Sequence, residues 1–315
     1  MKRFRNILLV CNFDTKQHMA EERAVSLAKQ NKAHLTVITV VNTLSSDAHT
    51  AFTLMPTQEL HSLVIDYCRE KVNALAADII QQGVEARSLV VTGTPFLEVI
   101  RQVLRDKHDL VILAAEGKRG VNDRLFGATS MHLMRKCPCP VWVVKRTQTR
   151  PYTRILAAVD PSIHDSTGGT INPLILQLAS GMARMEAGEL HIIHAWYLFG
   201  ERYVRGSGMK EEAVQEAKML QKKQHKKRFD TLLGRADVTD LKPHLHLIEG
   251  TPEECIPKLV LEQDIDLLVM GTVSRTGIAG FLIGNTAEEV LNRVDCSVLT
   301  LKPEGFVTPV PLNKS

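Results

Sequence analysis

Short apolar runs alternate with longer amphipathic segments along the whole chain. The runs contain few polar residues, which is typical of strands buried on both faces of a parallel sheet. Each amphipathic segment has helical spacing and leads into another apolar run. This order predicts an α/β fold in which each half forms an open, doubly wound, Rossmann-like sheet of five parallel strands. The predicted strands include residues 6–11, 34–41, 109–114, 141–144, 154–159, 190–196, 266–271 and 298–301, and the predicted helices include 19–30, 58–82, 172–183 and 210–233.

The two halves are copies of one domain. Shifting the chain by 157 residues places the Gly-Thr-Pro at 93–95 on the Gly-Thr-Pro at 250–252, and the alignment continues without a gap to Lys145 and Lys302. Fourteen of these 53 aligned positions are identical, and they include three pairs of glycines. The period is far above the roughly 20 to 50 residues of solenoid repeats, so the pattern indicates two tandem domains. The predicted domains are 1–146 and 154–303, with a C-terminal tail at 304–315.

Local signals place the ends of several helices. Thr94 and Thr251 are predicted N-caps, each followed by a proline at the first helical position. Gly83 and Gly234 are predicted to end the long helices that precede them.

The composition is that of an ordinary globular protein and argues against several classes. Hydrophobic residues make up 44% and charged residues 23% of the chain, with a net charge of +4. No apolar run approaches the roughly 18 residues of a membrane span, and the run after the basic start is too short for an export signal. We therefore expect a soluble, cytoplasmic protein with no membrane partner. The basic run at 222–228 is interpreted as a solvated helix face, so nucleic acid is an unlikely partner.

The cysteines and histidines offer only weak metal signals. Cys137 and Cys139 fit neither a zinc nor a thioredoxin spacing, and the six cysteines suit reduced thiols in the cytosol. His194 and His246 lie on neighbouring predicted strands, and a zinc site built from these two and a third ligand is geometrically feasible. No carboxylate or cysteine at a diagnostic spacing supports that site, so we assign no metal.

The candidate ligand site lies where the strands end. Ligands of doubly wound sheets bind outside the carboxyl ends of the strands, which here places Asp160 near the loop 271–286. Gly284, Asn285 and Thr286 fall where a helix is predicted to begin, and backbone N–H groups there favour a phosphate. No Walker A motif or dinucleotide fingerprint is present. On spacing alone, these glycines serve equally well to shape a surface loop.

At this loop the chain resembles the universal stress protein family. Its nucleotide-binding members carry G-x2-G-x9-G-[ST] after the fourth strand and an aspartate after the first. Gly271 and Gly284 match that motif, whereas Ser274 replaces its second glycine and Asn285 its hydroxyl residue. The resemblance extends over the whole chain and implies an adenine nucleotide alpha hydrolase-like fold with ATP and magnesium as the cofactor. The ligand-binding residues that it implies are Asp160, Met270, Gly271, Ser274, Gly277, Gly284, Asn285 and Thr286.

The first half departs further from the motif. Asn12 replaces the aspartate, Ala114 the first glycine and Ala128 the hydroxyl residue, although Gly117, Gly127 and Thr129 remain. We therefore interpret the first site as degenerate. The tandem arrangement resembles the two-domain members of the family.

Three functions follow from these observations. The leading one is a non-catalytic stress-response protein that binds a nucleotide or another small anionic ligand in its second half. The second is a slow ATPase, although no residue is assigned as catalytic. The third is an adaptor that has lost nucleotide binding and takes a protein partner, an apolar ligand or zinc instead. The resemblance also implies that the final strands, 141–144 and 298–301, form an internal pseudo-dimer, and it leaves a homodimer of whole chains open.

Overall fold

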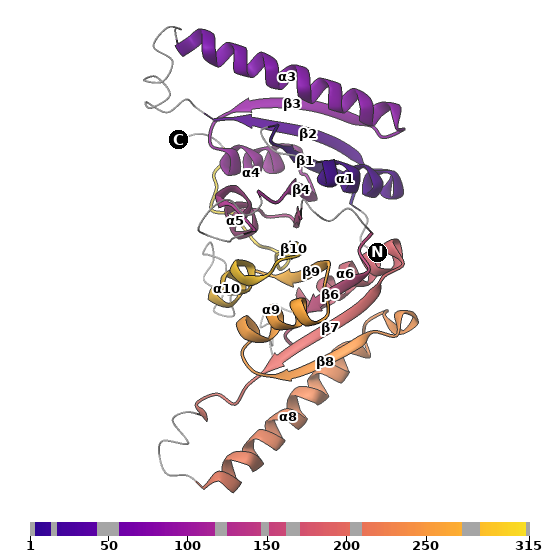
Figure 1. Ribbon diagram of the computed structural model, residues 1–315, viewed down its shortest axis with the longest axis vertical. Coiled ribbons are helices and arrows are strands. Elements are labelled where there is room, and N and C mark those ends of the chain that lie inside the picture. The colour runs from indigo at the N-terminus through magenta and orange to yellow at the C-terminus, as the bar shows by residue number, and fades with distance from the viewer. Residues whose placement is uncertain are drawn as a thin grey trace. The chain divides into compact units, whose positions relative to one another are not determined.

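The chain folds into two compact units, each described here by itself (Figure 1). The N-terminal unit contains mainly Lys2–Thr149 and Ser297–Ser315, and the C-terminal unit contains mainly Arg150–Gly277 and Gly284–Cys296. The computed structural model describes residues 4–13, 18–42, 57–116, 125–145, 151–161, 171–201, 210–272 and 284–312.

The N-terminal unit is a sheet with helices on both faces. Its strand order is β3-β2-β1-β4-β5-β10, in which β1 to β5 are parallel and β10 is antiparallel to β5. Right-handed crossovers place α1 and α3 on one face and α4 and α5, which contact each other, on the other. The elements are β1 (Asn6–Cys11), α1 (His18–Asn31), β2 (His34–Val41), α3 (Thr57–Gln81), β3 (Ala86–Thr92), α4 (Pro95–Asp106), β4 (Leu110–Ala114), α5 (Ala128–Lys136), β5 (Val141–Val144) and β10 (Ser297–Leu301).

The C-terminal unit repeats this design with the strand order β9-β6-β7-β8, all parallel. Helices α9 and α10 pack together on one face, and α6 and α8 arise from the crossovers on the other. The elements are β6 (Arg154–Ala158), α6 (Ile171–Glu186), β7 (Glu189–Trp196), α8 (Glu211–Leu233), the 3-10 turn Thr239–Leu241, β8 (His244–Glu249), α9 (Pro252–Glu262), β9 (Leu267–Gly271) and α10 (Asn285–Arg293).

The observed strands explain why an aspartate occurs at the same position in both halves, as Asp109 and Asp266. The carboxylate of Asp266 accepts hydrogen bonds from the backbone N–H groups of Thr153 (2.7 Å) and Arg154 (3.0 Å), at the start of β6. The carboxylate of Asp109 likewise accepts hydrogen bonds from the backbone N–H groups of Arg5 (2.7 Å) and Asn6 (3.1 Å), at the start of β1. Each carboxylate therefore fixes the amino end of the first strand beside the fourth strand of its half.

The backbone conformation before α4 and α9 explains why a glycine occurs there in both halves. Gly93 and Gly250 have φ values of +144° and +143°, which side chains rarely permit. A Cβ on Gly93 would also lie 2.8 Å from Oε1 of Glu98. Thr94 and Thr251 occupy the predicted N-cap positions, but neither hydroxyl makes a capping hydrogen bond.

The predicted α/β fold and tandem arrangement are confirmed. The helical bounds agree with the prediction within three residues at each end, because the apolar strands and the polar loop residues mark the transitions clearly. The described helices include none that is both long and apolar enough to cross a membrane.

The last strand of the sequence lies beside β5. Val298 is opposite Val143 and Leu299 is opposite Trp142, and all four side chains are buried. Just beyond β10, Lys302 is only 7% exposed, and its Nζ donates a 2.7 Å hydrogen bond to the carbonyl of Met134 in α5. Burial lowers the pKa of Lys302 to about 7.

We expect Lys302→Met to remove a pH dependence of stability. The ordinary lysine pKa is about 10.4, so between about pH 7 and pH 10.4 the unfolded state binds more protons and stability rises with pH. Below that range the full cost of the buried charge is present, and methionine should raise the free energy of unfolding by about 1–3 kcal/mol. Denaturant unfolding at about pH 6 and pH 9 measures both effects. Lys145→Met, at the equivalent and half-buried position, should leave the pH profile of the wild type intact.

Candidate functional site

The candidate site lies at the carboxyl ends of β6 and β9. Ala158 in β6 is paired with Met270 in β9, so Asp160 and Thr272, each two residues further on, leave the sheet at the same edge. Asp160 is half-buried. This edge is where ligands bind in doubly wound sheets.

A buried asparagine fixes the turn after β6. The backbone N–H of Asp160 donates to Oδ1 of Asn172 (3.0 Å), and Nδ2 of Asn172 donates to the carbonyl of Asp160 (2.8 Å). Asn172 lies in the first turn of α6 and is 2% exposed. These two bonds hold the backbone that carries the Asp160 carboxylate, so the position of that charge depends on Asn172.

The end of β9 is joined directly to the start of α10. The N–H of Gly284 donates to the carbonyl of the fully buried Thr272 at 3.0 Å. Gly284 is the N-cap of α10, and the N–H of Glu288 donates back to the carbonyl of Gly284. The Gly284 N–H is therefore used within the protein. The donors left for an anion are those of the first turn of α10, where Asn285 and Thr286 are exposed.

Gly271 allows close packing at this edge. A Cβ added there would lie 3.0 Å from Cδ1 of Ile171, the first residue of α6. The glycine therefore lets the start of α6 approach the end of β9. Met270 is 4% exposed within β9 and belongs to the core. Ser274 and Gly277 lie outside the described residues.

The equivalent place in the N-terminal unit already holds a negative charge. Gly127 is the N-cap of α5, and a Cβ added to it would lie 1.7 Å from Oε2 of Glu116. The Glu116 carboxylate thus lies against the N-terminus of α5, where a helix dipole favours an anion. Glu116 was not among the site residues predicted from the sequence. The sequence signal for this placement is an acidic residue two positions after β4, because the second half has Val273 at the equivalent position.

The histidines pair differently from the sequence-based hypothesis. His194 Nε2 lies 2.8 Å from Nδ1 of His225 in α8, whereas His246 Nε2 lies 3.1 Å from Nδ1 of His191. The register places His246 opposite Ile193, so strand alternation puts His194 and His246 on opposite faces of the sheet. The hypothesis of a metal site shared by His194 and His246 was therefore wrong.

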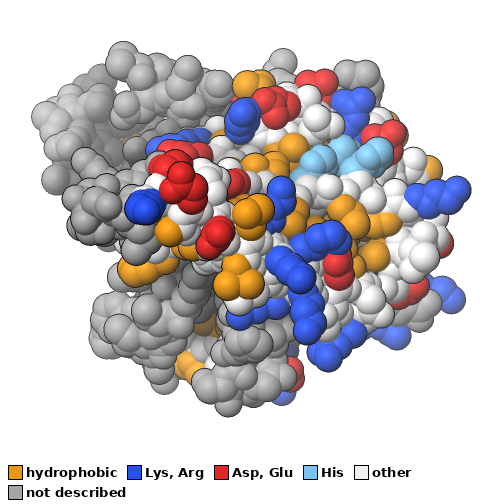
Figure 2. Space-filling model, turned by 90° about the horizontal axis from the view of Figure 1, so that it is seen from below, with side chains coloured by type: hydrophobic (Ala, Val, Ile, Leu, Met, Phe, Trp, Pro, Cys, Tyr) orange, Lys and Arg blue, Asp and Glu red, His pale blue; other side chains and the backbone are white. Residues whose placement is uncertain are grey.

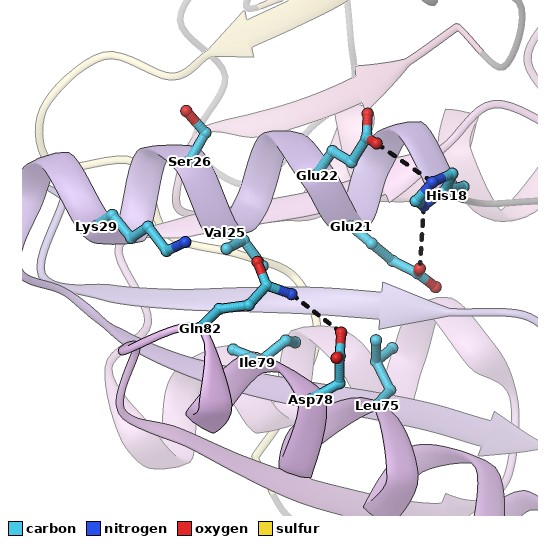
Figure 3. Close-up of a pocket in the computed structure, with 10 residues that line it drawn as sticks. All are labelled: His18, Glu21, Glu22, Val25, Ser26, Lys29, Leu75, Asp78, Ile79 and Gln82. Atoms are coloured by element: carbon cyan, nitrogen blue, oxygen red, sulfur yellow. Dashed lines mark hydrogen bonds and ion pairs between the residues drawn. The ribbon is translucent and has the colours of Figure 1, made fainter.

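A groove between α1 and α3 is a weaker candidate (Figure 3). Its volume is about 320 Å³. Several charged and polar groups that line it pair with one another, including His18 with Glu22 (3.2 Å) and Gln82 with Asp78 (3.0 Å). The side chains that line the groove include both acidic and basic groups, so it offers no feature that selects one kind of ligand.

We expect Asn172→Ala to destabilise the C-terminal unit and to loosen the site. The change leaves the buried backbone groups of Asp160 without their partner, which costs about 1–3 kcal/mol. Denaturant unfolding measures this loss. Ser180→Ala is the control and should cost less, because this equally buried hydroxyl donates to the carbonyl of Gln177 within the same helix. Equal losses in both variants would contradict the assigned role of Asn172.

Comparison with known proteins identifies relatives over the full length of the chain. The sequence model of the Universal stress protein family matches residues 3–145 and 151–302. A Universal stress protein E homolog from Haemophilus influenzae is 26% identical over 96% of this chain and 98% of its own length. Universal stress protein E of Escherichia coli is 26% identical over 99% of this chain and 98% of its own length.

The solved structures agree with these sequence relatives. A putative universal stress protein from Pseudomonas aeruginosa superposes with a TM-score of 0.68 at 25% identity, covering 96% of this chain and 95% of that one. A functionally unknown protein from the same organism gives a TM-score of 0.67 at 25% identity, covering 96% and 94%. The two matched segments coincide with the two halves of the sequence repeat, and such a tandem pair fits an internal pseudo-dimer. The chain therefore belongs to the universal stress protein family, as a stress-response protein with two tandem family domains.

Proposed function

We propose that this protein is a cytoplasmic, non-catalytic stress-response protein that binds a phosphate-bearing nucleotide in its C-terminal unit. ATP with magnesium is the leading ligand. The observation that carries the proposal is the bond between Gly284 and Thr272, which fixes the exposed first turn of α10 at the carboxyl edge of β9. Asp160 lies at the same edge, where it could accept hydrogen bonds from a nucleoside.

The electrostatics support a ligand phosphate at the start of α10. The helix carries partial positive charge at its N-terminus, and the first-turn N–H groups have no acceptor within the helix. Asn285 and Thr286 supply side-chain donors beside them. A phosphate that binds there would also be favoured over neutral ligands, since it neutralises the end of the dipole.

The contrast with the N-terminal unit supports one site per chain. There the Glu116 carboxylate lies at the N-terminus of α5, so a phosphate would have to displace it or approach a like charge. Asn12 and Ala114 further remove the aspartate and the first glycine of the family motif. We therefore assign nucleotide binding to the second half alone.

Matched aspartate substitutions test this assignment. Asn285 and Ala128 occupy equivalent, exposed first positions of α10 and α5. An aspartate at either position favours the helix, so a loss of binding is not explained by unfolding. In calorimetric titration with ATP and magnesium, the wild type should bind close to one ATP per chain. Asn285→Asp should weaken binding by about tenfold or more, because like charges at an exposed helix end and a phosphate repel. Ala128→Asp should bind as the wild type does.

The outcomes separate the alternatives. Absence of saturable binding up to millimolar ATP would contradict the proposal and favour an adaptor that has lost its nucleotide, as Ser274 in the loop suggests. Equal weakening in both variants would contradict the assignment to the second half. Phosphate release above a control without protein, lost in Asn285→Asp, would favour the slow ATPase over a non-catalytic role.

A further inference from the structure

A second group of polar side chains lies at the opposite end of the C-terminal sheet. Glu189 is the first residue of β7, His191 is its third, and His244 is the first residue of β8. The parallel register places His191 directly beside His244, and their rings stack with centroids 4.7 Å apart. Alternation along β7 puts Glu189 on the same face as His191. Figure 2 shows histidine side chains gathered beside acidic and basic ones on the surface of the molecule.

The three side chains converge through atoms that can bind a metal. One carboxylate oxygen of Glu189 and one ring nitrogen from each of His191 and His244 all lie within 4.8 Å of one another. Nε2 of His191 is 3.7 Å from Oε2 of Glu189. Strand pairing therefore brings together two imidazoles and a carboxylate, the ligand set that proteins use for zinc and related divalent ions.

The buried nitrogen of His191 points independently to a ligand. His191 is 2% exposed, and its Nε2 has no hydrogen-bond partner among the residues that the structure describes. Leaving a buried polar atom unsatisfied costs about 1–3 kcal/mol, so such atoms in a native protein call for an explanation. A metal ion bound at Nε2 would satisfy this atom.

A neighbouring histidine prepares His191 to bind a metal. Nδ1 of His191 lies 3.1 Å from Nε2 of His246. When Nδ1 donates its proton to His246, Nε2 carries the lone pair that a metal requires.

We propose that Glu189, His191 and His244 form a binding site for a divalent transition-metal ion of the zinc class. His246 acts as a positioning residue that fixes the ring of His191. Donor atoms around a tetrahedral zinc ion lie about 3.4 Å apart, so the exposed Glu189 and His244 must move toward the buried His191. Water would complete the tetrahedral coordination.

The charge nearest the site does not prevent binding. Nε of Arg154 lies 3.6 Å from Oε2 of Glu189, but the same guanidinium also reaches the carboxylate of Asp264 (3.4 Å). Arg154 therefore keeps a partner when the Glu189 carboxylate turns toward a metal. The site lies at the amino ends of β7 and β8, whereas the nucleotide site lies at the carboxyl ends of β6 and β9, so the two proposals can fail separately.

Zinc titration of the full-length protein tests the site. We expect one high-affinity Zn²⁺ per chain, measured by competition with a colorimetric chelator, and a higher thermal unfolding midpoint with Zn²⁺. Glu189→Gln and His244→Gln change exposed side chains and should preserve the fold. Each should weaken zinc binding by about tenfold or more and reduce the zinc-dependent shift in unfolding.

The N-terminal unit supplies a matched control. His34 begins β2, the strand that corresponds to β7, and its Nδ1 lies 2.6 Å from the carboxylate of Glu85. Both side chains are largely exposed, at 69% and 78%. His34→Gln removes a histidine–glutamate pair that has no third metal ligand within the described part of the chain, and it should leave zinc binding unchanged.

Two results would overturn the proposal. One is zinc affinity no tighter than millimolar in the wild type. The other is binding that persists in both Glu189→Gln and His244→Gln, which would place the ion elsewhere, for example at the neighbouring thiols of Cys137 and Cys139 (Sγ to Sγ 3.5 Å). Substitution with Co²⁺ distinguishes these sites, because nitrogen and oxygen ligands give no thiolate charge-transfer band.

Discussion

The carboxylate of Asp266 holds the amino end of β6 against β9, and the candidate nucleotide site depends on that register. Because the strands start together, Ala158 lies beside Met270, and the chain leaves both strands at one edge. Asn172 in α6 then holds the backbone of Asp160 by two hydrogen bonds, and the carbonyl of Thr272 accepts the N–H of Gly284. The Asp266 carboxylate, at the amino end of β6, thus helps to set the strand register that brings Asp160 and Thr272 to the same carboxyl edge. The corresponding carboxylate in the first half, Asp109, performs the same task for β1.

The two ends of the C-terminal sheet are chemically different. At the carboxyl ends, the candidate site is built largely from backbone groups and a helix terminus, which suit a delocalised anion. At the amino ends of β7 and β8, it is built from imidazoles and a carboxylate, which suit a compact cation. The same parallel strands present both, since every parallel strand contributes its amino end to one edge and its carboxyl end to the other. The two proposed ligands would therefore not compete for the same groups.

Sequence reasoning was strongest where the information is local or repeated. The apolar runs predicted the strands, and the identities between the halves predicted the duplication. Neither inference requires knowledge of side-chain contacts. The start of α10 at Asn285 lies within the three residues, 284–286, where a helix was predicted to begin. The pairing of the histidines could not be predicted, because it depends on which residue of β8 lies beside His191. The use of the Gly284 N–H and the placement of Glu116 against Gly127 likewise depend on contacts across a loop.

The position of β10 has a consequence for how the chain can be divided. The sequence repeat suggests that a cut at the linker near residue 150 would release two self-sufficient pieces. However, β10 comes from the end of the second repeat and belongs to the N-terminal unit, where it covers the edge of β5. A fragment that ended at the linker would expose the unpaired backbone of β5 and the apolar side chains of Trp142 and Val143 beside it. The first repeat therefore depends on a strand of the second repeat to cover the edge of its sheet.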